Sequence, residues 1–252
     1  MSRPLLAVND VTRQFGNLVA VDDVSYSLDS GELVALIGPN GAGKTTMYNL
    51  LTGRLSPTAG EIRFNGRNIE SMSPAERTDL GVGRSFQITN VFEGLTVRQN
   101  IRAPIIARSS ARFDPISNVE SHDEVGAETD EILDMVGLTD IESEECATLS
   151  YGDKRRVEIG VTLATDPELV LLDEPAAGMN PQQADEMIDL IEYLYDQMDV
   201  TFLVTEHDMD IVFALAERIL VLDQGRIIAD GSPEAIQTDE RVRSAYLGGE
   251  SE

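Results

Sequence analysis

Apolar and polar residues follow two patterns along the chain, and each pattern predicts a different kind of strand. Three five-residue runs are apolar almost throughout, at residues 33–37 (LVALI), 169–173 (LVLLD) and 201–205 (TFLVT). Runs of this length and composition predict buried strands. The first thirty residues instead alternate, with Val24, Tyr26 and Leu28 on one face. This alternation, together with an extended segment at residues 61–64, predicts an antiparallel sheet beside the buried strands.

Turn-forming residues mark where two hairpins close. Asn65-Gly66 directly follows residues 61–64 and is a strong signal for a hairpin turn. Gln224-Gly225 predicts the turn of a final hairpin within residues 218–231. Because strands alternate with helices over much of the chain, we predict an α/β fold with a mostly parallel sheet and a flanking antiparallel sheet.

The middle of the chain has a different character. From about residue 87 strand signals disappear and helix signals dominate; residues 130–136 predict the C-terminal half of a helix that Gly137 ends. Residues 109–121 are acidic and loop-like. We therefore predict two parts: an α/β core formed by residues 1–86 and 165–252, and an inserted helical subdomain formed by residues 87–164.

Composition indicates a globular protein without a membrane span. The chain has 252 residues, of which 42% are hydrophobic, enough for one large or two small domains. No apolar run in the sequence approaches the length that crosses a bilayer, and the N-terminus has no secretory hydrophobic region. The one cysteine, Cys146, excludes an internal disulfide and a cysteine-based metal cage. We expect a cytosolic protein.

Acidic residues greatly outnumber basic ones. The chain has 45 Asp and Glu against 19 Lys and Arg, a net charge of −26, and its only lysines are Lys44 and Lys154. Residues 114–145 carry many of the carboxylates and no Lys or Arg. We expect no nucleic acid as a bulk partner, because phosphate binding needs a net basic patch. The composition resembles that of proteins from salt-loving microbes, in which salt screens the repulsion between like charges.

One glycine-rich segment connects the buried strand at residues 33–37 to a helix predicted over residues 47–51: Gly38-Pro39-Asn40-Gly41-Ala42-Gly43-Lys44-Thr45-Thr46. It fits G-x-x-x-x-G-K-[ST], the P-loop that binds nucleotide phosphates. Glycines let backbone N–H groups surround phosphate oxygens, and the helix N-terminus adds its positive end. Lys44 can reach the β- and γ-phosphates, and the Thr45 hydroxyl can ligate Mg²⁺. We predict a P-loop NTPase (RecA-like) core that binds ATP and Mg²⁺.

Two carboxylates end the second buried strand. Asp173 is the last residue of the run 169–173, and Glu174 follows it. Strand ends are where a doubly wound sheet presents catalytic groups. Beside a triphosphate, Asp173 would hold Mg²⁺, directly or through water, and Glu174 would polarise the attacking water. A solvated acidic pair is the alternative, and the P-loop upstream favours the catalytic interpretation.

A helix N-terminus of unusual sequence precedes this strand: Leu149-Ser150-Tyr151-Gly152-Asp153. It resembles the signature motif of ATP-binding-cassette (ABC) ATPases, usually written LSGGQ. Tyr151 replaces the third-position Gly and Asp153 replaces the Gln, whereas Ser150 and Gly152, which would face a γ-phosphate, are present. The negative charge of Asp153 would lie near that phosphate and could be offset by the basic residues that follow, Lys154, Arg155 and Arg156. An ordinary helix capped by Ser150 is the alternative.

The order of these motifs resembles the ABC ATPase family over essentially the whole chain. The resemblance implies that Gln87 is the Q-loop glutamine, that His207 is the switch histidine and that Phe15 stacks on adenine. Residues 176–180 stand at the D-loop position, where Asn180 replaces the usual Asp. The implied catalytic residues are Glu174, His207 and Lys44, and the implied metal ligands are Thr45, Gln87 and Asp173. The nucleotide would be bound by residues 38–46, Phe15, Gln87, Ser150 and Gly152.

Several stretches look like the branched-chain amino-acid importer subclass: Ser85-Phe86-Gln87, Leu149-Ser150-Tyr151-Gly152, residues 173–178, Glu206-His207-Asp208-Met209 and Ala245-Tyr246-Leu247-Gly248. Urea-type importers share much of this pattern. The resemblance implies a head-to-tail dimer with a second, identical or different, ATP-binding subunit, in which the P-loop of one copy and the Ser150 region of the other enclose each ATP. It also implies transmembrane permease subunits, indirect action with an extracellular solute-binding protein, and a peripheral location on the cytoplasmic face of the membrane.

Two other classes of function stay open. A soluble ABC ATPase for DNA repair would carry a long coiled coil between P-loop and signature, and the sequence has no heptads there. A soluble ABC ATPase for cofactor assembly fits the chain length. A regulatory module that binds nucleotide without hydrolysing it is disfavoured by Glu174 and His207.

Overall fold

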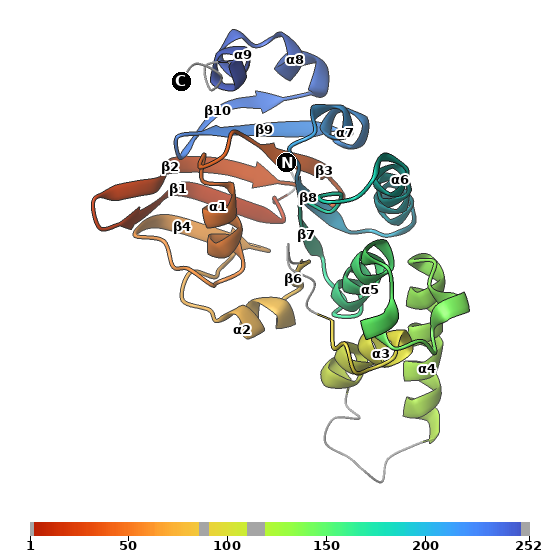
Figure 1. Cartoon of the computed structure of the whole chain (residues 1–252). Helices are drawn as coiled ribbons and strands as arrows, with labels where there is room; N and C mark the ends of the chain where they lie inside the picture. The colour runs from red at the N-terminus through yellow and green to blue at the C-terminus, as the bar shows by residue number, and fades with distance from the viewer. Residues whose placement is uncertain (1–2, 86–90, 110–118, 248–252) are drawn as a thin grey trace.

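The structure, a computed structural model, describes residues 3–85, 91–109 and 119–247, and its strands form two sheets (Figure 1). The strands are β1 Leu6–Phe15, β2 Leu18–Leu28, β3 Leu33–Ile37, β4 Ala59–Phe64, β5 Arg67–Asn68, β6 Val82–Arg84, β7 Leu169–Asp173, β8 Thr201–Thr205, β9 Arg218–Asp223 and β10 Arg226–Gly231. The helices are α1 Lys44–Leu51, α2 Pro74–Asp79, α3 Val97–Arg108, α4 Val119–Met135, α5 Tyr151–Leu163, α6 Pro181–Gln197, α7 Met209–Leu215, α8 Pro233–Thr238 and α9 Glu240–Leu247.

The larger sheet contains the three apolar runs and has the strand order β10-β9-β3-β8-β7-β6. Its strands pair in parallel from β9 to β6, and β10 pairs antiparallel with β9. Every residue of β3, β7 and β8 is buried. The predicted strands at residues 33–37, 169–173 and 201–205 are therefore confirmed, with the predicted ends.

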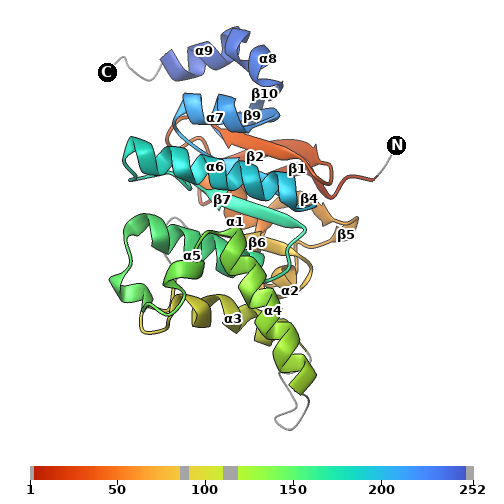
Figure 2. The ribbon, with the colours of Figure 1, turned by 90° about the vertical axis from the view of Figure 1, so that its right-hand side faces the viewer.

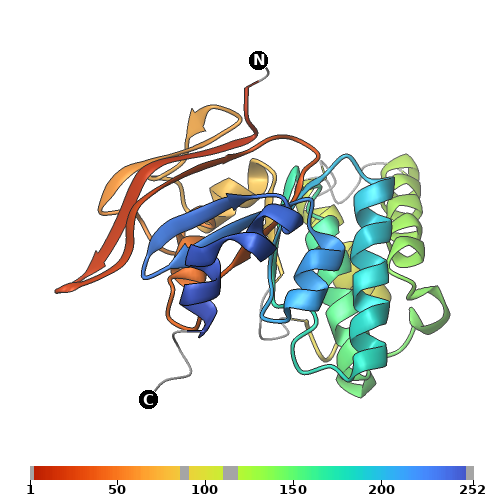
Figure 3. The ribbon, with the colours of Figure 1, turned by 90° about the horizontal axis from the view of Figure 1, so that it is seen from above.

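The parallel sheet is apolar on both faces because each face packs into its own hydrophobic core. Along β3, Leu33, Ala35 and Ile37 enter one core, and Val34 and Leu36 enter the other. The first core lies under helices α3 to α7, and the second lies between the parallel sheet, α1 and the antiparallel sheet β2-β1-β4-β5. Figure 3 shows these layers from above, with the antiparallel sheet on one side and the long helices on the other.

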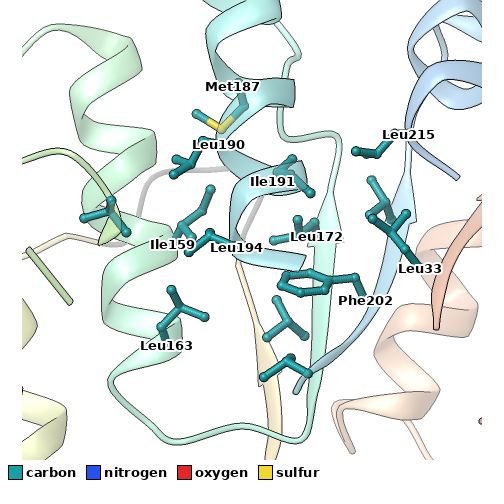
Figure 4. Packing of buried hydrophobic residues seen from close by; sticks show 14 of the residues in the cluster. Leu33, Ile159, Leu163, Leu172, Met187, Leu190, Ile191, Leu194, Phe202 and Leu215 are labelled. Atoms are coloured by element: carbon teal, nitrogen blue, oxygen red, sulfur yellow. The ribbon is translucent and has the colours of Figure 1, made fainter. Parts of the chain in front are cut away.

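Helix α6 illustrates how the outer layer is fixed. Its buried residues recur at helical spacing, so they form one stripe. The stripe consists of Met187, Leu190, Ile191 and Leu194. Figure 4 shows these side chains facing Ile159 and Leu163 of α5 and Leu172 and Phe202 of the sheet. The outer face of α6 carries mostly charged and polar residues.

Both predicted hairpin turns are confirmed, and two other details differ from prediction. Asn65-Gly66 and Gln224-Gly225 both have positive φ, as a tight two-residue hairpin turn requires. The predicted loop at residues 109–121 is partly wrong, because α4 already begins at Val119; residues 110–118 lie outside the described residues. Strand β6 was not predicted.

Helices α3, α4 and α5 lie between β6 and β7 in the chain and to one side of the sheet (Figures 1 and 2). Ion pairs join α3 to its neighbours: Arg98 Nη1 lies 2.6 Å from carboxylate oxygens of both Asp130 and Glu142, and Arg108 pairs with Glu128. The division of the chain at residues 86/87 and 164/165 stays a prediction.

Exposed carboxylates cover the outer face of α6, and that helix has no basic residue of its own; Arg156 of α5 lies 3.6 Å from one of them, Glu186. They are Asp185, Glu186, Asp189, Glu192 and Asp196. Since the Debye length is about 10 Å at 0.1 M salt and about 3 Å at 1 M, neighbouring charges on such a face repel strongly only in dilute buffer. The chain has 45 acidic against 19 basic residues, so basic side chains are too few to balance this repulsion.

We therefore expect the melting temperature to rise as KCl is increased from about 0.1 M toward molar concentration. Thermal unfolding followed by circular dichroism measures it. A variant with Asp185, Asp189, Glu192 and Asp196 changed to the amides should show a shallower rise. A melting temperature that is flat or falls over this range would contradict the resemblance to proteins of salt-loving microbes.

Candidate functional site

The glycine-rich loop between β3 and α1 packs tightly against two other segments. A Cβ on Gly38 would lie 2.0 Å from the carbonyl oxygen of Leu222, and a Cβ on Gly43 would lie 2.5 Å from that of Ala20. Gly43 also has φ 111°, which side-chain-bearing residues rarely adopt. Glycine is therefore required at both positions, and the loop is fixed between β9 and β2.

The N-terminus of α1 is suited to an anion. Its N-cap is Gly43, which offers no side-chain acceptor, and its first turn has no acidic residue. In contrast, the N-caps of α2, α3 and α6 each accept a hydrogen bond from their own first turn through a side chain. The first N–H groups of α1, with the positive end of the helix dipole, are thus available to phosphate oxygens. Thr45 is exposed at this end and Thr46 is half-buried.

Lys44 lies across the loop that precedes it. Its buried ammonium group donates to the carbonyl oxygens of Gly38 at 2.5 Å and Pro39 at 3.2 Å. Burial lowers the pKa of Lys44, and the nearby carboxylates of Glu174 and Asp173 act to raise it. The structure therefore brings the predicted phosphate-binding lysine close to both predicted carboxylates.

Asp173 ends β7 with both carboxylate oxygens engaged. The side chain of Arg84 donates to Oδ2 at 2.6 Å, and the Thr205 hydroxyl donates to Oδ1 at 2.9 Å. Arg84 also donates to Asn49 Oδ1 of α1 at 2.8 Å, so it links β7 to the P-loop helix. Sequence reasoning missed Arg84, because a single basic residue at the end of a three-residue strand is a weak signal.

Glu174 and His207 form the centre of the site. The Nε2 atom of His207 lies 2.6 Å from Oε1 of Glu174. The histidine is 46% exposed and the glutamate 16%, so the pair lies at the surface edge of the sheet. Glu174 has φ 50°, an uncommon conformation held by hydrogen bonds from its N–H to the carbonyl oxygen and hydroxyl of Thr205. The structure thus brings together two residues that the sequence placed after different strands.

Glu206 supports this pair and was missed by sequence reasoning. Its buried carboxylate accepts from the backbone N–H of Ala176 at 2.9 Å and from that of His207 at 3.3 Å. Burial raises the pKa of Glu206, and these two hydrogen bonds oppose the rise. Glu206 therefore ties the segment after β7 to the segment after β8.

Ser150 is the N-cap of α5, and its hydroxyl is engaged within its own helix. The Ser150 Oγ atom accepts from the Asp153 N–H at 3.1 Å and donates to Asp153 Oδ2 at 2.6 Å. Ser150 therefore caps this helix, as the alternative interpretation of the motif predicted, and its predicted role toward a γ-phosphate stays a prediction. Before Ser150 could donate to a phosphate, its hydroxyl would have to leave the Asp153 carboxylate.

We expect Asp153→Gln to leave α5 capped and to give equal or tighter ATP-driven association of two subunits. The substitution removes a negative charge from the side where a phosphate would approach and removes the charged acceptor that holds the Ser150 hydroxyl. Sedimentation velocity with and without ATP measures the association. Weaker association would show that the carboxylate is needed, for example as a favourable charge at the helix N-terminus.

Phe15 lies at the tip of the β1–β2 hairpin. It is 41% exposed, the Arg13 guanidinium lies 4.5 Å from its ring centroid, and Leu18 and Val19 beside it are also exposed. Strand β2 continues from this tip to Ala20, which contacts Gly43 of the P-loop. The ring of Phe15 is thus exposed, and its predicted contact with adenine stays a prediction. Gln87 lies outside the described residues.

The donors present suit Mg²⁺ shared with phosphate oxygens. Within the described part of the chain, no group of three or more His, Cys, Asp or Glu could hold a metal ion. The two predicted ligands that the structure describes, Thr45 and Asp173, offer hydroxyl and carboxylate oxygens, which Mg²⁺ prefers. Since Mg²⁺ is usually bound by one or two protein groups together with substrate phosphates, these residues fit such an ion.

Comparison with known proteins gives matches over nearly the whole chain. Residues 21–177 match the family model described as ABC transporter, and residues 226–252 match one described as branched-chain amino acid ATP-binding cassette transporter. The high-affinity branched-chain amino acid transport ATP-binding protein LivG of Salmonella typhimurium is 39% identical, covering 98% of this chain and 99% of its own. BraF of Pseudomonas aeruginosa, with the same description, is 38% identical with the same coverage.

Solved structures also match this chain over nearly its whole length. The ADP conformation of MJ1267, an ATP-binding cassette of an ABC transporter, superimposes with a TM-score of 0.85 at 30% identity, covering 98% of this chain and 100% of that one. CbiO1 from Clostridium perfringens, part of an ABC transporter complex, gives a TM-score of 0.83 at 25% identity and covers 99% of this chain and 96% of that one.

Proposed function

The chain belongs to the ABC transporter family as an ATPase subunit of an importer, and we propose that the importer carries branched-chain amino acids. The observation that carries the proposal is the match of residues 226–252 to the branched-chain amino acid model, because this segment lies outside the shared ATPase region. Relatives with that description also align over nearly the full length of both chains. The spermidine/putrescine import protein PotA of Pseudomonas aeruginosa is 36% identical, but this chain covers only 63% of it.

We propose the following roles for the site residues. Lys44 and the N–H groups of the P-loop, residues 38–46, bind the β- and γ-phosphates, and Phe15 stacks on adenine. Glu174 accepts the proton of the attacking water, and His207, at 2.6 Å, orients that carboxylate. Mg²⁺, held by Thr45, Asp173 and Gln87, would supply positive charge to the transferring phosphoryl group.

The assembly is also a proposal. Ser150 and Gly152 of one subunit would approach the γ-phosphate bound by another, so that two ATP molecules are enclosed between two subunits. Among the helices that the structure describes, none combines the length and apolarity that a bilayer crossing needs. Because the relatives are transport ATP-binding proteins, we propose that the solute passes through separate permease subunits, with this chain bound to their cytoplasmic face and a solute-binding protein acting from outside.

Reconstitution tests the transported solute. Candidate permeases and this subunit are placed in proteoliposomes with a solute-binding protein loaded with leucine, urea or putrescine, and phosphate release and uptake are measured. We expect leucine to stimulate both. Stimulation by urea or putrescine alone would contradict the proposed solute, and hydrolysis that never depends on permeases would favour the soluble cofactor-assembly alternative.

A further inference from the structure

Two side chains of α5 hold the segment that carries Glu174. This segment, residues 174–178, is called the catalytic turn below. The Tyr151 hydroxyl donates to the carbonyl oxygen of Ala177 at 3.2 Å, and the Arg155 side chain donates to the carbonyl oxygen of Glu174 at 3.2 Å. Tyr151 and Arg155 are four residues apart on α5 and therefore lie on one face of the helix. The turn is thus held near both of its ends by one face of one helix.

Both side chains are themselves fixed. Arg155 is buried and pairs at 2.8 Å with the buried Glu158 of the same helix. Its guanidinium lies 5.8 Å from the centre of the Tyr151 ring, within range of a cation–π contact. A Cβ on Gly178 would lie 3.9 Å from that ring, so Tyr151 also covers the end of the turn.

The opposite side of the catalytic turn is held by the sheet. Glu174 donates its N–H to Thr205, the last residue of β8, and Ala176 donates its N–H to Glu206, the residue after that strand. Residues 174–178 therefore form a bridge between the parallel sheet and α5. Because Glu174 has a strained backbone conformation, its carboxylate position depends on both sets of contacts.

We propose that Tyr151 and Arg155 are positioning residues for hydrolysis. Through these two side chains, the position of α5 determines the position of the catalytic turn. The proposal rests on the proposed dimer, in which Ser150, next to Tyr151, faces the ATP bound by the partner subunit. Arrival of ATP at the partner's P-loop then shifts the start of α5 and, through Tyr151 and Arg155, the Glu174 carboxylate of the same chain. A glycine at position 151, as in the LSGGQ pattern, has no side chain that reaches Ala177.

Tyr151→Phe tests the hydroxyl alone, with Tyr193→Phe, an exposed tyrosine on α6, as the matched control. Tyr151 is 42% exposed, so removing one oxygen should leave the melting temperature and ATP binding by the single subunit at the control values. We expect kcat to fall at least threefold relative to the control, because one hydrogen bond to the catalytic turn is lost. We also expect the Hill coefficient for ATP to fall toward one, because the coupling between the two sites is weakened. KM should change less than kcat.

Arg155→Lys is the second variant, since it keeps a charge beside Glu158 but lacks the planar fork that reaches Glu174. In the double variant, kcat should fall by less than the product of the two single-variant losses, because both side chains act on the same turn. A kcat for Tyr151→Phe within threefold of the Tyr193→Phe control, or an unchanged Hill coefficient, overturns the proposal. Failure of the proposed function would be seen in the unaltered chain instead, as stimulation by urea or putrescine alone or as hydrolysis that never depends on permeases.

Discussion

Glu174→Gln is expected to slow ATP hydrolysis by about 10²–10⁴-fold while leaving ATP binding intact, because a positioned general base contributes about that much. Glutamine has nearly the shape of glutamate and can keep a contact to His207 Nε2, so the site retains its form. It cannot accept the proton of the attacking water. Under the proposed mechanism, closure of the dimer still occurs, and an ATP-bound dimer accumulates.

Phosphate release measures the loss of hydrolysis, and size-exclusion chromatography with ATP measures the dimer. Glu192→Gln is the matched control, because it removes the same charge from the exposed face of α6. Hydrolysis by Glu174→Gln at the rate of this control would mean that another group is the base. A loss of ATP binding would instead mean that Glu174 has a structural task near Lys44, whose pKa it acts to raise.

The parallel sheet was predictable from the sequence because its physical cause is local. A strand buried on both faces must be apolar at every position, as in β3, and the run of apolar residues marks its ends. Strand β6 shows the limit of this argument. It has only three residues, and it forms because it pairs with β7. Helix α5 also packs closely against it: a Cβ on Gly83 would lie 2.8 Å from the side chain of Thr162. Neither partner is visible in the local sequence.

The residues of the candidate site also fall into those that local sequence predicts and those that it does not. Lys44, Asp173 and Glu174 were predictable because each stands at a fixed offset from a strand or a glycine pattern, and the structure places them close together. Their supports come from distant segments: Arg84 from β6, Glu206 from the end of β8 and Arg155 from α5. The sequence around a single basic or acidic residue does not indicate which distant residue it contacts, so these contacts are seen only in the folded structure. The roles of the site residues stay proposals until variants are measured.

The two lysines of this chain offer a direct comparison for nucleotide binding. We expect Lys44→Ala to weaken ATP binding by the single subunit by about 100-fold or more. Charge-assisted hydrogen bonds contribute about 1.5–3 kcal/mol each, and 1.4 kcal/mol corresponds to a factor of ten in affinity. Alanine also removes the contacts of the ammonium group to Gly38 and Pro39, so the loop loses an internal support.

Lys154→Ala serves as the control, because Lys154 lies on α5 and pairs with Glu93 at 3.4 Å rather than with the P-loop. Both variants lose one positive charge from a chain of net charge −26, so a general electrostatic effect on the anionic nucleotide would weaken binding equally. Calorimetric titration at fixed salt separates the two cases. If Lys44→Ala binds ATP as tightly as Lys154→Ala, the P-loop assignment fails; if only Lys44→Ala loses affinity, the phosphates bind where α1 begins.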